Sequence, residues 1–306
     1  MSKTVALALG SGGARGYAHI GVIDALTARG YNIVMVSGCS MGAIVGGFYC
    51  SGRLEEFRDW ITRLKYLDVL KLVDVSLLSS GVIKGDRLYN RISEMLNGQL
   101  IEDLAVPFTA VATDIIGKKE VWFQRGPLQH AVRASAAIPS LFTPVADNGR
   151  LLVDGAVLNP LPITPCVSAH ADIIIAVDLN ADVPLPEDFH PDAAVKESDK
   201  KAWFNGIVDK AGQWLENKTS ARKDVDENLG KLEMLNEVFE VMSASLTRYK
   251  IAGYPPDLLI KLPSDACEMY EFYRADEIIR LGREVADMAL DAYEAGHSSL
   301  YGERMG

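Results

Sequence analysis

Apolar runs with strand-like spacing alternate with helical patterns along the first 180 residues of the chain. Two of these runs, at 5–9 and 173–177, are continuously apolar, which is typical of parallel strands that are covered on both faces. The pattern predicts strands at 4–9, 32–37, 108–113, 120–124, 150–154 and 173–178. It predicts helices at 17–28, 43–49, 54–64, 85–97 and 128–135. This alternation indicates a three-layer α/β/α fold with a mainly parallel central sheet.

The pattern changes at about residue 181, where the chain becomes polar and rich in Pro and Asp, so we expect a surface excursion over about 181–230. Within it, residues 203–215 place their apolar side chains on one helical face. This face could cap a site, touch a membrane or join subunits, and the simplest alternative is that it packs on the core. The later pattern predicts a helix over 232–249, a strand over 257–262 and a helix over 275–295. We therefore expect a single domain over 1–306, with a core at about 4–180 and a helical completion over 231–306.

Composition narrows the class of protein. The net charge is −10 and no basic run offsets it, which argues against nucleic acid as a partner. The four cysteines form no C-x-x-C pair, so neither a disulfide framework nor a zinc site is expected, and a reducing compartment suits them. The apolar run at the N-terminus is too short for a signal peptide, and no run approaches the length of a membrane span. We expect a cytoplasmic protein.

The most informative motif is a serine in a sharp turn between a predicted strand and a predicted helix. The residues are Gly38-Cys39-Ser40-Met41-Gly42. A G-x-S-x-G sequence in that context is typical of a nucleophile elbow, which exposes the serine hydroxyl at the strand end. The flanking Gly38 and Gly42 suit a turn that has no room for side chains. Ser40 is therefore the candidate nucleophile of a hydrolase or an acyltransferase.

A second glycine-rich turn, GSGGARG at 10–16, joins the first predicted strand to the first helix. Its glycines are spaced one residue too widely for a dinucleotide fingerprint, and no acidic residue ends the second strand, so we expect no cofactor. The backbone N–H groups of Gly12 and Gly13 instead suit an oxyanion hole beside a helix N-terminus. The simpler alternative is that these glycines only permit a tight turn.

A serine nucleophile needs a base within hydrogen-bond reach. No histidine follows a late strand in a glycine-rich loop, as a triad histidine would; the five are His19, His130, His170, His190 and His297. Asp154 is the stronger candidate, because it ends an apolar strand and is followed by the small residues Gly155 and Ala156. The carboxyl ends of strands in an open sheet share one crevice, so Asp154 could meet Ser40. Burial would have to raise the pKa of this weak base, and an ordinary Asp-Gly turn is the alternative.

Taken together and in this order, the motifs GGARG at 12–16, GCSMG at 38–42 and DGA at 154–156 resemble the patatin-like phospholipases. The segment RASAAIPSLFTPV at 133–145 is also similar to that family, and the resemblance covers about residues 4–180. The end of the chain resembles the bacterial RssA-type members, which are related to neuropathy target esterase. One departure is Ser11, which stands where many members have Gly but keeps its backbone N–H.

The resemblance implies a Ser–Asp dyad without histidine, in which Ser40 is the nucleophile and Asp154 the base. It implies that N–H groups near Gly12 and Gly13 bind the oxyanion and that Arg15 helps to fix their loop. It also implies hydrolysis of fatty-acyl esters, phospholipids or lysophospholipids through an acyl-enzyme and without a metal. An acyltransferase with the same acyl-enzyme and a non-enzymatic lipid- or partner-binding protein stay open, as do transient contact with a membrane surface and a homo-oligomer.

Overall fold

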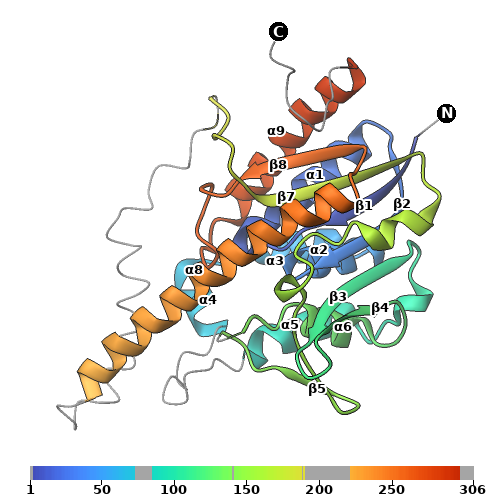
Figure 1. Ribbon diagram of the computed structural model, residues 1–306. Helices are drawn as coiled ribbons and strands as arrows, with labels where there is room; N and C mark the ends of the chain where they lie inside the picture. Colours follow the sequence, from blue (N-terminus) through green and yellow to red (C-terminus); the bar gives the residue numbers. More distant parts are fainter. Residues whose placement is uncertain (1–2, 73–84, 140, 188, 190–220, 297–306) are drawn as a thin grey trace.

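The computed structural model describes residues 3–72, 85–139, 141–187, 189 and 221–296. Its eight strands form one sheet in the order β5-β6-β3-β2-β1-β7-β8, with β4 paired to β3 (Figure 1). The strands are β1 Thr4–Leu9, β2 Asn32–Cys39, β3 Phe108–Asp114, β4 Lys119–Phe123, β5 Val145–Asp147, β6 Arg150–Asp154, β7 Ile173–Ala181 and β8 Leu258–Pro263. Strands β8, β7, β1, β2 and β3 run parallel, whereas β4, β5 and β6 pair antiparallel at one end.

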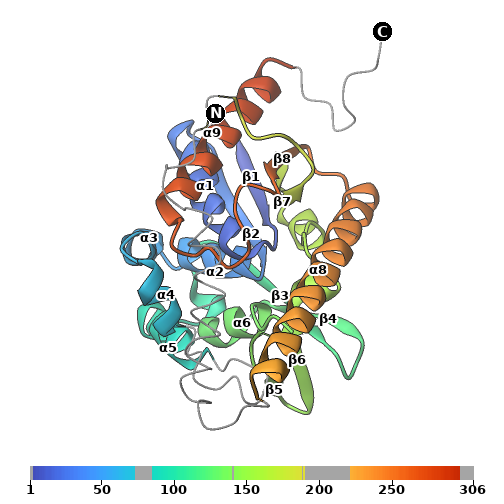
Figure 2. The ribbon, with the colours of Figure 1, turned by 90° about the vertical axis from the view of Figure 1, so that its left-hand side faces the viewer.

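Helices cover both faces of the sheet. Figure 2 shows the sheet between α1 and α9 on one side and α8 on the other. The α-helices are α1 Ala18–Ala28, α2 Met41–Cys50, α3 Leu54–Ile61, α4 Tyr66–Leu72, α5 Asp86–Leu96, α6 Leu128–Ser135, α8 Ala221–Gly253 and α9 Ala275–Glu294. The 3₁₀ turns are η1 Gly13–Tyr17, η3 Ile101–Asp103, η4 Gly155–Val157 and η5 Thr164–Ala169. The predicted layered fold with a mainly parallel sheet is confirmed.

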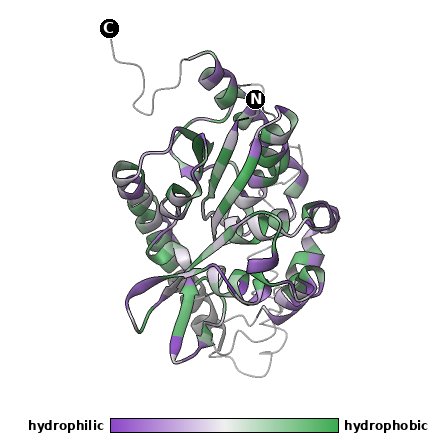
Figure 3. Cartoon of the chain, turned by 90° about the vertical axis from the view of Figure 1, so that its right-hand side faces the viewer, coloured by the Kyte–Doolittle hydropathy of each residue, from purple (hydrophilic) through white to green (hydrophobic). Residues whose placement is uncertain are grey.

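The central strand β1 has two different faces, both buried. Val5, Leu7 and Leu9 belong to the main hydrophobic core, which includes residues of α1, α2 and α9. Ala6 and Ala8 belong to a smaller core on the opposite face, beside η5. Figure 3 shows hydrophobic residues concentrated along these central strands. A strand that is buried on both faces must be apolar throughout, which explains the continuous run in the sequence.

One prediction about the C-terminal half is wrong. Helix α8 begins at Ala221, inside the stretch expected to be a surface excursion, and not at 232. The segment 221–230 is polar, but it contains no Pro and is rich in residues that tolerate a helix, so polarity alone was a poor guide. Helix α4 and strand β5 were not predicted. The apolar face expected at 203–215 lies outside the described residues.

Strand register brings the carboxyl end of β6 to the carboxyl end of β2. In the parallel pair β2–β3, Cys39 lies opposite Val111. In the antiparallel pair β3–β6, the next residue of β3, Ala112, lies opposite Asp154. Strand β6 therefore approaches the site from the opposite direction to β2. The two side chains meet because both strands pair with β3, and not because parallel strands share one edge.

Candidate active site

Ser40 occupies a strained turn between β2 and α2. Its backbone has φ 56° and ψ −123°, a conformation that non-glycine residues rarely adopt and that is enriched at active sites. The flanking glycines permit this turn. A Cβ on Gly38 would lie 2.4 Å from the carbonyl oxygen of Gly42, and a Cβ on Gly42 would lie 2.3 Å from that of Leu9. The predicted strand, turn and helix around Ser40 are present as expected.

A buried serine of α6 holds the elbow in place. The backbone N–H of Ser40 donates a hydrogen bond of 3.0 Å to Ser135 Oγ, which in turn donates one of 2.6 Å to the carbonyl oxygen of Val111. The α6 helix thereby links the elbow to β3. Ser135 lies in the segment at 133–145 that resembles the patatin-like proteins, but the sequence alone assigns it no task.

Asp154 ends β6 beneath the elbow and is fully buried. Its Oδ1 accepts a 2.8 Å hydrogen bond from the N–H of Ala156 and lies 3.8 Å from the thiol of Cys39. Gly155 is equally constrained, because a Cβ there would lie 2.2 Å from the carbonyl oxygen of Val111. The small residues after Asp154 therefore let β6 and η4 pack directly against β3 and the elbow.

The environment of Asp154 changes its proton affinity. Burial raises the pKa of the carboxyl from 3.8 to about 6, and the Ser40 side chain, the Ala156 N–H and the Cys39 thiol offset only part of this rise. The contact with Ser40 lies outside normal hydrogen-bond geometry, and Oδ2 has no hydrogen-bond partner among the described residues. At neutral pH the carboxyl is thus ionised, has a free lone-pair oxygen and lies beside the Ser40 hydroxyl.

The glycine loop at 10–16 lies beside the elbow. Gly13 has φ 56°, and a Cβ on it would lie 2.5 Å from the carbonyl oxygen of Met269. The N–H groups on either side of Gly12 and Gly13 already form hydrogen bonds of 2.8 Å. Ser11 donates to the carbonyl oxygen of Pro160, and Ala14 donates to that of Met269. No residue in the described part of the chain accepts a hydrogen bond from the N–H of Gly12 or Gly13. These two donors remain available to a ligand.

Arg15 is directed away from the cavity and ties the loop to two distant elements. Its Nη1 donates a 2.8 Å hydrogen bond to Oδ1 of Asn180. The Nδ2 of Asn180 in turn donates a 3.0 Å hydrogen bond to the carbonyl oxygen of Ser11. Its Nη2 donates over 2.8 Å to Oε1 of Glu240 on α8. Arg15 is buried, so this pairing satisfies a charge that would otherwise be costly. Sequence reasoning missed both Asn180 and Glu240, because only the tertiary structure brings them to residue 15.

The described histidines have other environments. His19 is buried in α1, where its Nε2 donates a 2.8 Å hydrogen bond to the carbonyl oxygen of Gly10. Burial lowers the pKa of His19 to about 4, so the ring is neutral at pH 7. None of His19, His130 and His170 lines the cavity described below, and His190 and His297 lie outside the described residues.

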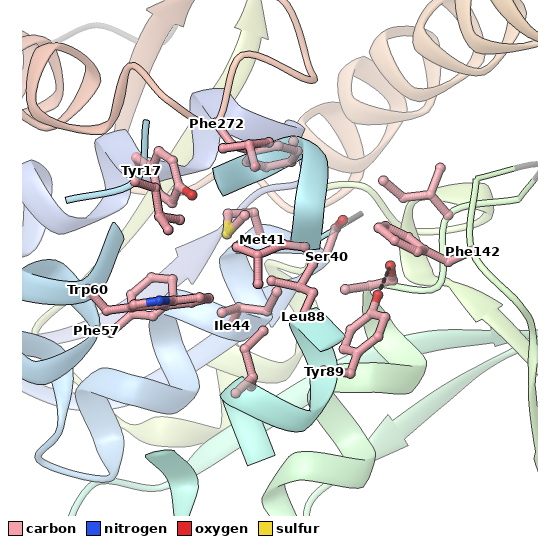
Figure 4. Close-up of a pocket in the computed structure, with 17 residues that line it drawn as sticks. Tyr17, Ser40, Met41, Ile44, Phe57, Trp60, Leu88, Tyr89, Phe142 and Phe272 are labelled. Atoms are coloured by element: carbon pink, nitrogen blue, oxygen red, sulfur yellow. Dashed lines mark hydrogen bonds between the residues drawn. The ribbon is translucent and has the colours of Figure 1, made fainter. Parts of the chain in front are cut away.

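Ser40 and Gly13 line an apolar cavity of about 60 Å³ (Figure 4). Its walls come mainly from α2, α3 and α5 and include Met41, Ile44, Phe57, Trp60, Leu88 and Tyr89. The Tyr89 hydroxyl donates to the carbonyl oxygen of Ala136, so one of the few polar groups at the wall is already satisfied. The sequence predicted helices at 54–64 and 85–97, but it did not indicate that they wall the site.

The described part of the chain contains neither a metal-binding cluster nor a membrane-spanning helix. No cluster of three or more His, Cys, Asp or Glu side chains there is arranged to hold a metal ion. No helix in that part has both the length and the apolarity that a membrane span requires.

The protein is thus an α/β protein in which a serine elbow and a glycine loop border one apolar cavity and a buried carboxyl lies beneath the elbow. The profile of one family, described as patatin-like phospholipase, matches residues 7–167, which is more than half of the chain. The chain belongs to the patatin-like phospholipase family.

Individual relatives agree with this assignment. An uncharacterized NTE family protein of Mycobacterium tuberculosis is 40% identical, over 96% of this chain and 93% of its own length. Neuropathy target esterase sws of Drosophila melanogaster is 32% identical, over 58% of this chain and 13% of its own length. Among solved structures, VipD from Legionella pneumophila matches with a TM-score of 0.53 over 95% of this chain and 67% of VipD. At 15% identity, that match supports the fold alone.

Proposed function

We propose that the protein is a serine esterase that hydrolyses fatty-acyl esters of the phospholipid or lysophospholipid type. The observation that carries the proposal is the position of Ser40. Its strained backbone places the side chain at the wall of an apolar cavity, with a buried carboxyl directly behind it. Membership of the patatin-like family, and the name of one relative, neuropathy target esterase, support the same reaction class.

The chemistry follows from the positions of the groups. Ser40 Oγ attacks the acyl carbonyl carbon while its proton passes to Asp154, whose pKa of about 6 leaves it ionised at neutral pH. The unpaired N–H groups of Gly12 and Gly13 bind the oxyanion. The alcohol leaves with the proton from Asp154. Water then gives a proton to Asp154 and attacks the acyl-enzyme, and that proton returns to Ser40 Oγ as the fatty acid leaves.

The cavity suits the apolar part of such a substrate. An acyl chain gains free energy when it leaves water for a wall of methyl, methylene and aromatic groups. The volume of about 60 Å³ holds about five water-sized groups. A short acyl chain is therefore the first substrate to test, and p-nitrophenyl butyrate meets that requirement.

Labelling with a fluorophosphonate probe, followed by mapping of the modified peptide, tests the nucleophile directly. We expect a single adduct on Ser40, and none in the Ser40→Ala variant. Ser168→Ala is the matched control, because Ser168 is exposed and does not line the cavity, and it should label normally. An adduct on another serine would refute Ser40 as the nucleophile, and no adduct at all would overturn the proposal in favour of a binding protein.

Turnover completes the test. Ser40→Ala and Asp154→Asn should each lower kcat for p-nitrophenyl butyrate by at least about 1,000-fold, because nucleophile and base act as a unit. Full activity in either variant would contradict the dyad. Product analysis with added alcohol or lysolipid acceptors then separates hydrolysis from acyl transfer, since only a transferase forms a new ester in preference to free acid.

A further inference from the structure

Helix α8 packs on the protein through its polar side. The residues that face the body are Glu240, Ser243, Thr247 and Lys250, of which Ser243 and Thr247 are buried. Six of its large apolar residues instead face solvent, namely Met234, Leu235, Val238, Val241, Met242 and Tyr249, whereas Phe239 and Leu246 are half-buried. Met234 is 69% exposed, Val241 68% and Tyr249 73%. This orientation is the reverse of an ordinary surface helix, whose apolar side faces the core.

The exposed apolar residues lie along one side of the helix, here called the apolar stripe, with the exposed Ser245 between Met242 and Tyr249. At about 100° per residue, all six fall within an arc of about 120°, with Ser243 and Thr247 on the opposite side of the helix. No charged residue of the segment 234–249 falls within that arc. Figures 1 and 2 show α8 on the outside of the molecule, where another surface can reach it.

Two ion pairs prevent the helix from turning its stripe inward. Glu240 pairs with the buried Arg15 over 2.8 Å, and Lys250 pairs with Glu120 over 2.7 Å. Rotation of α8 by half a turn would break both pairs and leave the buried Arg15 without its ionic partner, which is strongly unfavourable. The apolar stripe is therefore held toward solvent, and a group of exposed apolar side chains on one face marks an interaction site.

We propose that the apolar stripe pairs antiparallel with the same stripe of a second copy of this chain. Exposed Glu237 and Arg248 support this occupant, because both lie along the same edge of the stripe, about 20° apart around the helix. A two-fold axis near Met242 and Ser243, midway between these charges, places Glu237 of each copy beside Arg248 of the other. The midpoint of the stripe, which spans residues 234–249, lies within about one residue of this axis. The apolar positions and the charged positions therefore predict the same register.

Other arrangements fit the charges less well. A parallel pair would bring like residues to the same level and lose both opposite-charge contacts. A lipid surface would favour a basic rim along the stripe, but the rim has one Glu and one Arg and the whole chain has a net charge of −10.

Sedimentation velocity and light scattering on the full chain between 1 and about 100 µM, concentrations on the scale of ordinary dissociation constants, test the pairing. We expect a species of twice the monomer mass of 33.3 kDa. Val238→Glu, at the centre of the stripe, should weaken dimerisation at least 100-fold. Val167→Glu is the matched control, because Val167 is also exposed and apolar but lies on η5, and this variant should dimerise like the unaltered chain.

Charge reversal tests the register. Glu237→Arg and Arg248→Glu should each weaken dimerisation at least tenfold, and the double variant should restore it. Circular dichroism on each variant verifies that the fold is intact. A dimer that ignores Val238→Glu, or a double variant that fails to recover, would overturn the proposed pairing.

A chain that stays monomeric at about 100 µM would also refute the pairing. Flotation with phosphatidylcholine vesicles would then show whether the stripe binds lipid, through binding that Val238→Glu abolishes. The remaining outcome is a monomer that does not bind vesicles. If deletion of 200–216 then increases the binding of apolar dyes to the stripe, the stripe is covered by a segment of the same chain.

Discussion

The two backbone turns at the cavity, the elbow at 38–42 and the glycine loop at 10–16, are held in different ways. The elbow is held mainly by close packing of its glycines, since Gly38 packs against the backbone of Gly42 and Gly42 against that of Leu9, and one hydrogen bond from Ser40 to Ser135 anchors it. The glycine loop depends on distant segments. Its backbone bonds to Pro160 and Met269, while Arg15 reaches Asn180 and α8.

The difference teaches which changes should act locally and which at a distance. A turn made by glycine packing fails when a side chain is added inside it, because no other part of the chain can compensate. A loop held by remote side chains stays folded when one of them is removed, but its N–H donors no longer point at the position of the oxyanion. We therefore expect damage to the elbow to affect stability and activity together, and damage to the loop supports to affect mainly the rate.

The largest effect should come from Gly38→Ala. The added Cβ would lie 2.4 Å from the carbonyl oxygen of Gly42, so the elbow cannot close without backbone movement. We expect a loss of about 3 kcal/mol in the free energy of unfolding and at least 100-fold in esterase rate. Urea denaturation and turnover of p-nitrophenyl butyrate measure these changes. Gly253→Ala is the control, because a Cβ there meets nothing within 4 Å.

The next effect concerns stability and pH. Burial raises the pKa of Asp154 from 3.8 to about 6, so the folded state binds this proton more tightly than the unfolded chain does. The unaltered protein therefore loses about 2 kcal/mol of stability as the pH rises from about 4 to about 8, because the unfolded carboxyl is already partly ionised at pH 4. Asn does not titrate, so the free energy of unfolding of Asp154→Asn relative to the unaltered protein should increase by that amount between pH 4 and pH 8.

Thermal or urea unfolding at pH 4, 6 and 8 measures the difference. Ser40→Ala serves as the control, because it removes the nucleophile and retains the carboxyl. An Asp154→Asn variant whose relative stability does not change with pH would show that Asp154 has an ordinary pKa and would weaken its assignment as the base.

The smallest effect should come from the glycine loop. Asn180→Ala removes the hydrogen bond to the Ser11 carbonyl and the acceptor for Arg15. We expect kcat to fall about 10- to 100-fold with KM little changed, because the oxyanion donors are displaced and not removed. Asn180→Asp separates the two contacts, since it keeps the acceptor for Arg15 and loses the donor to Ser11. Full kcat in both variants would show that the loop does not depend on Asn180 of β7 for its position.

The sequence predictions also succeeded where nearby residues determine the structure and failed where distant residues do. The strands, the turn at Ser40 and the helix after it could be predicted, because apolar spacing and flanking glycines act over a few neighbouring residues. The start of α8 could not, because its polar first turns carry no apolar periodicity. The walls of the cavity were also beyond reach, since Phe57, Trp60 and Tyr89 come from helices whose packing is a tertiary property.

The sequence by itself determined the layered fold, the elbow and the choice of Ser40 and Asp154 as candidates, because residue type and spacing encode local backbone conformation. Only the tertiary structure decided how those candidates meet. Asp154 reaches the elbow through its antiparallel register with β3, and Arg15 meets Glu240 across 225 positions of the chain. Such contacts depend on how whole elements pack, and no local pattern records which distant side chains they bring together.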